Sequence, residues 1–304
     1  MLMDNNKIMI VGTGNVGASI AFALINQRTA VNEIILTDII AKDAEGEAMD
    51  LRDALAVSPS YIKITNGTYA DARDCDVVVI TAGAAQKPGE SRLDLLKKNV
   101  NILKGMIEQI MASGFDGIFL VVTNPMDVMT YFTMKFSGLP ADKVIGSGTV
   151  LDSARLRTRI ASYLDVNPKS VHAYQIGEHG DSELTLWSSA DVGGQPVSKL
   201  LFSSIRNDIS DFVTHEAYDI IDKKGATYYG IATCVADILN CILNDEHRVL
   251  AVSSYDHFSD TCFGWPTIVG RQGILRRLDL QLSEPEGIAL QKSINILKKA
   301  ISLR

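Results

Sequence analysis

A single histidine, His179, stands in a setting suited to proton transfer. It lies between two glycines and two carboxylates in the segment 177–182, directly after the apolar, β-prone run 171–176. Glycines leave room for a ligand to approach, and the end of a strand is a rigid mount for a proton donor. Because a lone histidine is also common as a structural residue, this segment by itself leaves both interpretations open.

The segment 149–164, whose pattern predicts a helix, carries Asp152, Arg155 and Arg157. Asp152 and Arg155 are three positions apart and therefore share one face. Arg157 lies about 200° around the helix from Arg155, at 3.6 residues per turn, so it faces elsewhere. The shared face offers a carboxylate that can orient a histidine and a guanidinium that can grip a substrate carboxylate.

The N-terminal segment carries a dinucleotide-binding pattern. The apolar run 7–11 predicts a buried strand and ends in Gly12-Thr13-Gly14-Asn15-Val16-Gly17, after which apolar residues recur at helical spacing. The first glycine permits a tight turn, the second lets backbone N–H groups approach a pyrophosphate, and the third allows close helix–strand packing.

A carboxylate follows at the expected distance. The second buried run, 34–37, ends in Asp38, about 20 residues past the last glycine, where it can bind both ribose hydroxyls. A carboxylate repels a 2′-phosphate, so the pattern favours NAD over NADP. The alternative is that Asp38 only caps the following helix.

Strands and helices alternate through the first half of the chain. Further strands are predicted at 61–65, 76–81 and 117–122, and helices near 42–57 and 92–112. Strands that are apolar throughout indicate a parallel sheet covered on both faces, with ligands beyond the carboxyl ends of the strands. We expect an α/β fold: a Rossmann-type doubly wound parallel sheet domain, residues 1–146, followed by a tightly packed α+β catalytic domain, residues 147–304.

The second half mixes short strands with long helices. A run from 183 to 192 ends at Gly193-Gly194, which predicts a hairpin turn. Ser283 and Glu286 form a capping box that begins the last helix. The remaining predictions are helices near 203–223 and 226–243 and strands near 248–255 and 266–282, with a turn at 271–273.

The loop 83–92 joins the strand at 76–81 to the long helix at 92–112. A glycine near each end and the cationic Arg92 suit a mobile lid over the site. An ordinary surface loop with a solvated arginine is the alternative.

The totals exclude several classes of function. With 304 residues, 46% hydrophobic and 21% charged, the chain has the composition of a globular protein, and its net charge of −7 disfavours nucleic-acid or anionic-membrane binding. No apolar run approaches the ~20 residues of a membrane span, and the first strand begins too early to leave room for a secretion signal. The four cysteines, Cys75, Cys234, Cys241 and Cys262, lack metal-ligand spacing and suggest reduced thiols in a cytoplasmic protein with no metal site.

A dinucleotide, a histidine, an aspartate and two arginines are what hydride transfer to a 2-oxo acid requires. Motifs in the same order resemble the L-lactate/malate dehydrogenase family, and the bacterial L-lactate dehydrogenases most closely. The resemblance covers nearly the whole chain and rests on the segments 12–17, 80–84, 89–92, 123–127, 148–155, 177–182 and 224–231.

The resemblance implies roles for individual residues. His179 would donate and accept the proton with Asp152 as its partner, Arg155 would bind the substrate carboxylate, and Arg92 would close over the carbonyl. Other implied contacts are Asn124 with the nicotinamide side of the site, Thr227 with the substrate's variable group, and Tyr69 with Ala82 and Gly83 along the adenine and ribose path.

The implied substrate depends on Gln86. Lactate enzymes of the family carry glutamine there and malate enzymes carry arginine, so the resemblance implies reversible hydride transfer between NADH and pyruvate to give L-lactate. A second carboxylate enclosed without a cation would cost several kcal/mol. Two departures point toward malate enzymes: Lys87-Pro88-Gly89 resembles their lid, and Ala85 stands where many lactate enzymes have arginine.

Arg157 and His172 match positions that bind fructose 1,6-bisphosphate at a subunit interface in allosteric bacterial members of the family. The resemblance therefore implies activation by this effector and a homotetramer, in which symmetry pairs two such sets around one ligand. The alternative is a surface ion pair at Arg157 and a structural His172.

Two competing functions remain. One is a malate dehydrogenase or broader 2-hydroxyacid dehydrogenase. The other is a non-catalytic NAD-binding protein, which the intact set of His179, Asp152, Arg155 and Arg92 disfavours.

Overall fold

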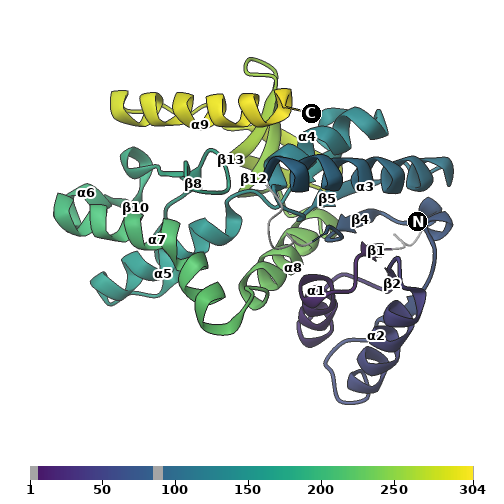
Figure 1. The fold of residues 1–304 in the computed structure, drawn as a ribbon. Coiled ribbons are helices and arrows are strands. Elements are labelled where there is room, and N and C mark those ends of the chain that lie inside the picture. Colours follow the sequence, from purple (N-terminus) through teal and green to yellow (C-terminus); the bar gives the residue numbers. More distant parts are fainter. Residues whose placement is uncertain (1–5, 85–91, 304) are drawn as a thin grey trace.

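The computed structural model describes residues 6–84 and 92–303, without the side chain of Arg92. A nine-stranded sheet runs through the centre in the order β14-β13-β12-β6-β5-β4-β1-β2-β3 (Figure 1). Its parallel part has the 3-2-1-4-5-6 order of a doubly wound dinucleotide-binding fold. These six strands are β1 (Lys7–Val11), β2 (Glu33–Thr37), β3 (Lys63–Asn66), β4 (Val77–Ile80), β5 (Ile118–Val121) and β6 (Val144–Gly146).

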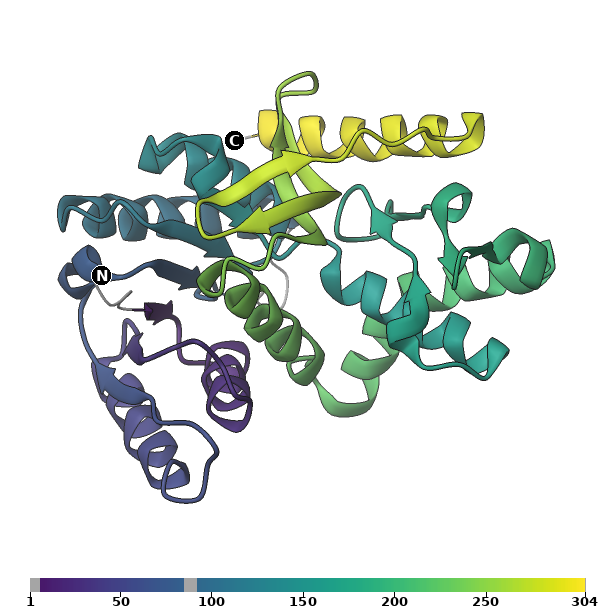
Figure 2. The same ribbon diagram turned by 180° about the vertical axis from the view of Figure 1, so that it is seen from behind.

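Three antiparallel strands from the second half extend the same sheet (Figure 2). They are β12 (Arg248–Asp256), β13 (Thr261–Gly270) and β14 (Gly273–Arg277). Ser253 of β12 pairs with Gly146 of β6, so the sheet continues across the boundary between the predicted domains.

Helices cover both faces of the sheet. In Figure 1, α3 (Arg92–Ala112), α4 (Met126–Ser137) and α9 (Glu284–Ser302) lie above it, while α1 (Asn15–Asn26), α2 (Ala41–Ala54) and α8 (Tyr229–Leu243) lie below. Strand β1 shows why: Ile8 and Ile10 pack into the core under α1 and α8, whereas Met9 and Val11 pack into the core under α3 and α4. Alternate residues of a strand point to opposite faces, so a run that is apolar throughout requires cover on both.

A third hydrophobic core lies beside the sheet, between α5 (Val150–Leu164) and α7 (Ser203–Lys224). The remaining short elements of the second half are β7 (Val171–His172), β8 (Gln175–Ile176), β9 (Leu184–Thr185), β10 (Asp191–Val192), β11 (Gln195–Pro196) and α6 (Val197–Leu200). The described chain also contains four short 3₁₀ helices: η1 (Tyr69–Asp74), η2 (Ala141–Lys143), η3 (Pro168–Ser170) and η4 (Trp187–Ser189).

The predicted fold class is confirmed, and the helix predicted at 92–112 coincides with α3. The capping box of Ser283 and Glu286 and the hairpin at Gly193-Gly194 are also present. Part of the local prediction is wrong. Strand β13 begins at Thr261 rather than near 266, β14 ends at Arg277 rather than near 282, and the run 183–192 is interrupted by η4. The turn expected at 271–273 is present between β13 and β14.

In the described part of the chain, no helix has the length and apolar character needed to cross a membrane. The four cysteines form no disulfide, and three of them are buried.

Candidate active site

The turn after β1 has the geometry that the glycine pattern predicts. Gly12 adopts a φ of +96°, and a Cβ there would lie 2.7 Å from the backbone nitrogen of Ala82. A Cβ on Gly17 would lie 1.9 Å from the carbonyl oxygen of Gly12. At Gly14 a Cβ would meet nothing within 4 Å, and no side chain caps α1 there. The first and third glycines are therefore required by packing, while the helix N-terminus opens onto space where a phosphate fits.

Asp38 lies across this turn. Its Oδ2 accepts a hydrogen bond from the backbone N–H of Thr13 at 2.7 Å, and its Oδ1 accepts one from the N–H of Ile40 at 3.1 Å. Ile40 is the N-cap residue of α2, and no side-chain hydrogen bond of that residue caps the helix, so Asp38 binds the residue before the helix rather than its first-turn N–H groups. Burial, and secondarily the charge of Asp38, raises the pKa of Tyr69.

A hollow of about 530 Å³ adjoins this carboxylate. Thr13, Gly14 and Asp38 line one part of it, and α2 supplies the remaining lining residues. The backbone N–H groups at the open N-terminus of α1 and the carboxylate of Asp38 together fit the adenosine and pyrophosphate part of NAD.

Helix α5 is fastened to the strand that leads to His179. Thr149 Oγ1 donates to the carbonyl oxygen of Gln175 at 2.6 Å, and the N–H of Gln175 donates to Ser153 Oγ at 2.9 Å. Both main-chain groups of Gln175 are thus held by hydroxyls of one helix turn. These two hydrogen bonds fix the position of Asp152 relative to the strand, because Asp152 lies between Thr149 and Ser153 on the helix.

The backbone of the histidine loop is bound by three separate elements. Gly177 exchanges two backbone hydrogen bonds with Gly264 of β13, at 2.8 and 2.9 Å. The N–H of Glu178 donates to Ser293 Oγ of α9 at 2.8 Å. The N–H of His179 donates to Asp127 Oδ2 of α4 at 2.7 Å. Three successive N–H groups therefore locate His179 without using its side chain.

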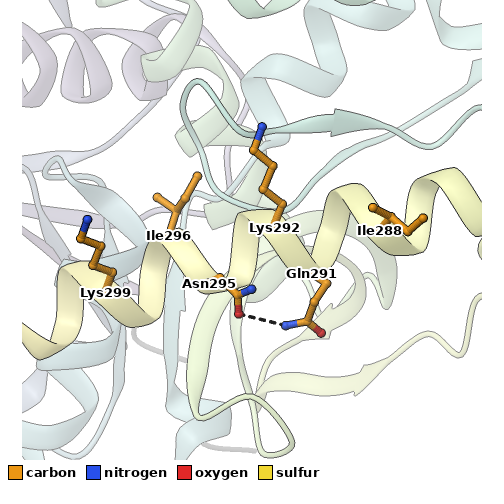
Figure 3. A pocket seen from close by; sticks show the side chains of 6 residues that line it. All are labelled: Ile288, Gln291, Lys292, Asn295, Ile296 and Lys299. Carbon is orange, nitrogen blue, oxygen red and sulfur yellow. Dashed lines mark hydrogen bonds between the residues drawn. The ribbon is translucent and has the colours of Figure 1, made fainter.

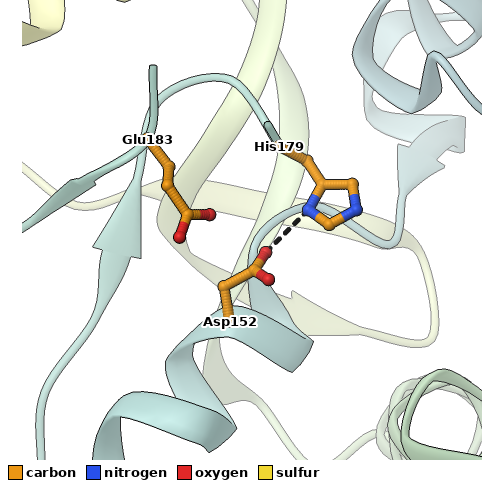
Figure 4. Close-up of side chains that lie close together, drawn as sticks. All are labelled: Asp152, His179 and Glu183. Atoms are coloured by element: carbon orange, nitrogen blue, oxygen red, sulfur yellow. Dashed lines mark hydrogen bonds and ion pairs between the residues drawn. The ribbon is translucent and has the colours of Figure 1, made fainter. Parts of the chain in front are cut away.

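The imidazole of His179 meets the carboxylate of Asp152, as Figure 4 shows. His179 Nδ1 and Asp152 Oδ2 are 2.7 Å apart, and Arg155 Nη1 donates to the other oxygen, Oδ1, at 2.9 Å. Arg155 Nε also lies 3.4 Å from Glu216 of α7. The Asp152 side chain is 4% exposed and that of His179 is 26% exposed. With Nδ1 engaged, Nε2 is the nitrogen left to exchange a proton with a ligand.

Electrostatics favours a charged pair. The negative charge of Asp152 raises the pKa of His179 to about 9, against the lowering effect of burial. Burial alone would raise the pKa of Asp152, but attraction and hydrogen bonding from His179, with Arg155, hold it below its usual range. At neutral pH the site therefore holds an imidazolium beside a carboxylate, ready to give up a proton.

Two carboxyl groups of this site were missed by the sequence analysis. Asp127 is buried, accepts from Ser253 Oγ at 2.6 Å as well as from His179, and has its pKa raised by burial to about 7. Its presence in a largely apolar segment was the available signal. Glu183 approaches His179 and Asp152 from the other side (Figure 4). The three side chains could together surround a cation, but His179 Nδ1 is already hydrogen-bonded to Asp152.

The other predicted site residues lie on several different elements. Ala82 and Gly83 follow β4, Asn124 is exposed before α4, and Thr227 is partly buried in the turn between α7 and α8. Arg92 is the first residue of α3. Gln86 and most of the predicted lid, including Lys87, lie outside the described residues.

A second hollow lies on another face of α5. Arg157 and His172 both line this cavity of about 830 Å³, together with Lys169 and Arg248. Arg248 is also bound through two nitrogens to Asp237, at 2.7 and 2.8 Å. The predicted pair of Arg157 and His172 is thus brought together, and Arg157 faces away from the cluster around Asp152.

A further hollow runs along the outside of α9 (Figure 3). All of its lining residues come from that one helix: Ile288, Gln291, Lys292, Asn295, Ile296 and Lys299. It contains none of the groups described above.

Comparison with known proteins agrees with this geometry. Residues 6–146 match the lactate/malate dehydrogenase NAD-binding domain, and residues 149–303 match the lactate/malate dehydrogenase α/β C-terminal domain. The chain belongs to the lactate/malate dehydrogenase family. L-lactate dehydrogenase 1 of Peribacillus psychrosaccharolyticus is 47% identical, over 98% of this chain and 96% of that protein.

Solved structures give the same result. The minor L-lactate dehydrogenase of Enterococcus mundtii in its ligands-bound form is 44% identical, with a TM-score of 0.96 and 98% of each chain covered. Its ligands-unbound form gives a TM-score of 0.91 at 42% identity, over 99% of this chain and 98% of that chain. The predictions of an NAD-dependent oxidoreductase of the lactate/malate dehydrogenase family and of NAD as its cofactor are confirmed.

Asp152→Asn tests the histidine–aspartate pair. We expect the NADH-dependent reduction of a 2-oxo acid at neutral pH to fall by about 10²-fold or more, because the amide cannot stabilise the imidazolium. The pKa of His179 should also fall toward the ordinary value of about 6.5. Steady-state kinetics across pH would measure both, with the exposed Asp53→Asn as a control. A variant with an unshifted pH profile would contradict the assignment.

Proposed function

We propose that the chain is an L-lactate dehydrogenase that reversibly transfers hydride between NADH and pyruvate. The observation that carries this proposal is the paired His179 and Asp152, with Arg155 attached to the same carboxylate, beside a glycine turn that fits a dinucleotide. Relatives named L-lactate dehydrogenase at 47% identity support it.

Each protein group has one task in the proposed reaction. When bound, NADH would supply the hydride that the carbonyl carbon receives. His179 Nε2 gives its proton to the carbonyl oxygen, so the C=O bond becomes CH–OH and the histidine is left neutral. Because His179 has a pKa raised to about 9, reduction is favoured below that pH and lactate oxidation, which needs neutral histidine, gains above it.

The proposed carboxylate-binding group is Arg155. Its two contacts with Asp152 and Glu216 use Nη1 and Nε, and a carboxylate would bind through the remaining N–H groups. Arg92 would then polarise the carbonyl oxygen from the lid. Asn124 and Thr227 complete the proposed substrate surroundings, while Gly12 to Gly17, Asp38, Tyr69, Ala82 and Gly83 bind NAD.

Gln86 supports pyruvate over oxaloacetate, because the second carboxylate of oxaloacetate would be enclosed without a cation. A malate or broader 2-hydroxyacid dehydrogenase is the second candidate, and Lys87 is the observation that favours it. If Lys87 turned into the site, it would supply the missing charge.

Gln86→Arg discriminates between these candidates. We expect the ratio of kcat/KM for oxaloacetate to that for pyruvate to rise by orders of magnitude, since about 1.4 kcal/mol corresponds to tenfold. The NADH oxidation rate with each substrate gives the ratio, and Lys87→Gln serves as the matched control. A ratio that barely moves in the Gln86 variant, with oxaloacetate activity lost in the Lys87 variant, would favour the second candidate.

We further propose that fructose 1,6-bisphosphate activates the enzyme through the cavity lined by Arg157 and His172. Their convergence with Lys169 on one open cavity supports an anion site. A homotetramer would pair two such cavities, and exposed apolar side chains such as Tyr163, Tyr218 and Ile221 supply surface for assembly.

Arg157→Gln tests this regulatory site. The variant should lose most of its response to fructose 1,6-bisphosphate, because one guanidinium that pairs with phosphate is removed. The initial rate of pyruvate reduction with and without the bisphosphate measures the response. Arg159→Gln is the matched control, since Arg159 lies on the same helix but stacks on Phe212. An unchanged response in Arg157→Gln would refute the proposal.

The division into an NAD-binding domain, 1–146, and a catalytic domain, 147–304, and a cytoplasmic location remain proposals. The absence of disulfides among the four described cysteines supports the location.

A further inference from the structure

Glu183 is a carboxyl group at the reaction centre that none of the roles above uses. It lies four residues after His179, just before β9. One of its oxygens, one oxygen of Asp152 and one ring nitrogen of His179 all lie within 4.8 Å of one another. A negative charge on Glu183 would therefore act directly on the proton-transfer pair.

The partner of Glu183 indicates which form it takes. Gln175 of β8 is 1% exposed, and its Nε2 donates to Glu183 Oε1 at 3.0 Å. The other atom of that amide, Gln175 Oε1, is buried and has no hydrogen-bond partner among the described residues. A carboxylic acid can accept from an amide N–H and donate to an amide oxygen, whereas a carboxylate can only accept. A proton on Glu183 would supply a donor beside this amide, which the ionised form cannot.

The charges around Glu183 also favour its protonated form. Burial, followed by the negative charge of Asp152, raises the pKa of Glu183 to about 8. His179 and Arg155 act in the opposite direction, and so does the hydrogen bond from Gln175. From α7, the hydroxyl of Thr214 donates to Glu183 Oε1 at 3.5 Å, while Glu216 is paired with Arg155. Ionising both carboxyl groups at this separation costs free energy, and Asp152 is the one that already pairs with two cations, His179 and Arg155.

We propose that Glu183 is a positioning residue: it is a neutral acid at neutral pH, and its ionisation in mildly alkaline solution keeps the proton on His179. This inference rests on the proposed function only in assigning His179 as the proton donor. When Glu183 loses its proton, the new negative charge favours the charged imidazolium, so His179 releases its proton at a higher pH. The two groups therefore titrate together, and the negative charge of Asp127, which accepts from the backbone N–H of His179, acts on the imidazole in the same direction in wild type and variant alike.

Glu183→Gln tests this directly, because glutamine keeps the shape and both hydrogen-bonding abilities of the acid but cannot ionise. We would follow the His179 imidazole by NMR in the cofactor-free protein between about pH 6 and pH 10. Its signal would be assigned by its loss in a His179→Gln variant. The midpoint should fall by about one pH unit in Glu183→Gln.

The matched control is Asp181→Asn, which removes an exposed carboxylate two residues from His179. Its charge is screened by water, so the midpoint should move far less. An identical His179 midpoint in Glu183→Gln and the wild type would overturn the proposal. So would an equal shift in the two variants, because any nearby charge would then explain it.

Infrared spectroscopy offers a second readout. In the difference between wild type and Glu183→Gln, a buried carboxylic acid C=O band should be present at neutral pH and disappear as the pH is raised through about 8, whereas any band from the buried Asp127 is common to both proteins. The absence of that band at neutral pH would also overturn the proposal.

Kinetics separates this proposal from the proposed function. If pyruvate is reduced, the alkaline fall in kcat/KM should begin at lower pH in Glu183→Gln, by the same amount as the NMR midpoint. A shifted midpoint in a protein that reduces no 2-oxo acid would support the role of Glu183 and reject the function. Pyruvate reduction with an unshifted pH profile would support the proposed function and reject the role of Glu183.

Discussion

The site depends on the buried hydrogen bond between Asp152 and His179. A carboxylate that is 4% exposed is costly to bury unless cations and donors compensate it, and Asp152 has both in His179 and Arg155. The same contact raises the proton affinity of the imidazole and fixes which of its nitrogens faces a substrate. The surrounding hydrogen bonds hold these two side chains at that distance. Hydroxyls of α5 bind the strand β8, and three successive backbone N–H groups hold the loop that carries His179.

Helix α5 connects the two candidate sites. Asp152 and Arg155 face the proton-transfer centre, while Arg157, on another side of the same helix, lines the cationic cavity with His172. A rotation or shift of this helix would therefore change both sites at once. Its hold on Gln175 through Thr149 and Ser153 would transmit such a movement to the loop that carries His179. This gives the proposed effector response a physical route within one subunit.

Sequence reasoning placed residues correctly where their position follows from local spacing. The glycine turn, Asp38 and the shared face of Asp152 and Arg155 depend on neighbours within one strand–helix unit. It failed where partners are distant in the chain: Asp127 is 52 residues from His179, and Ser293 is 115 residues from Glu178. The helix α4 and strand β6 were not predicted. Residues 126–133 of α4 are all buried, including Asp127, Thr130 and Thr133, so this segment lacks the exposed, charged face that marks an amphipathic surface helix. The charge state of Glu183 depends on such distant surroundings too.

The most direct test of the account compares wild type with His179→Gln, measuring NADH binding and NADH oxidation by pyruvate in the same preparations. We expect the variant to bind NADH as tightly as wild type, because the glycine turn and Asp38 are unchanged. We also expect pyruvate reduction to fall by about 10²–10⁴-fold, the range expected for loss of a positioned proton donor. A variant that reduces pyruvate within about tenfold of the wild-type rate would contradict the central role of His179.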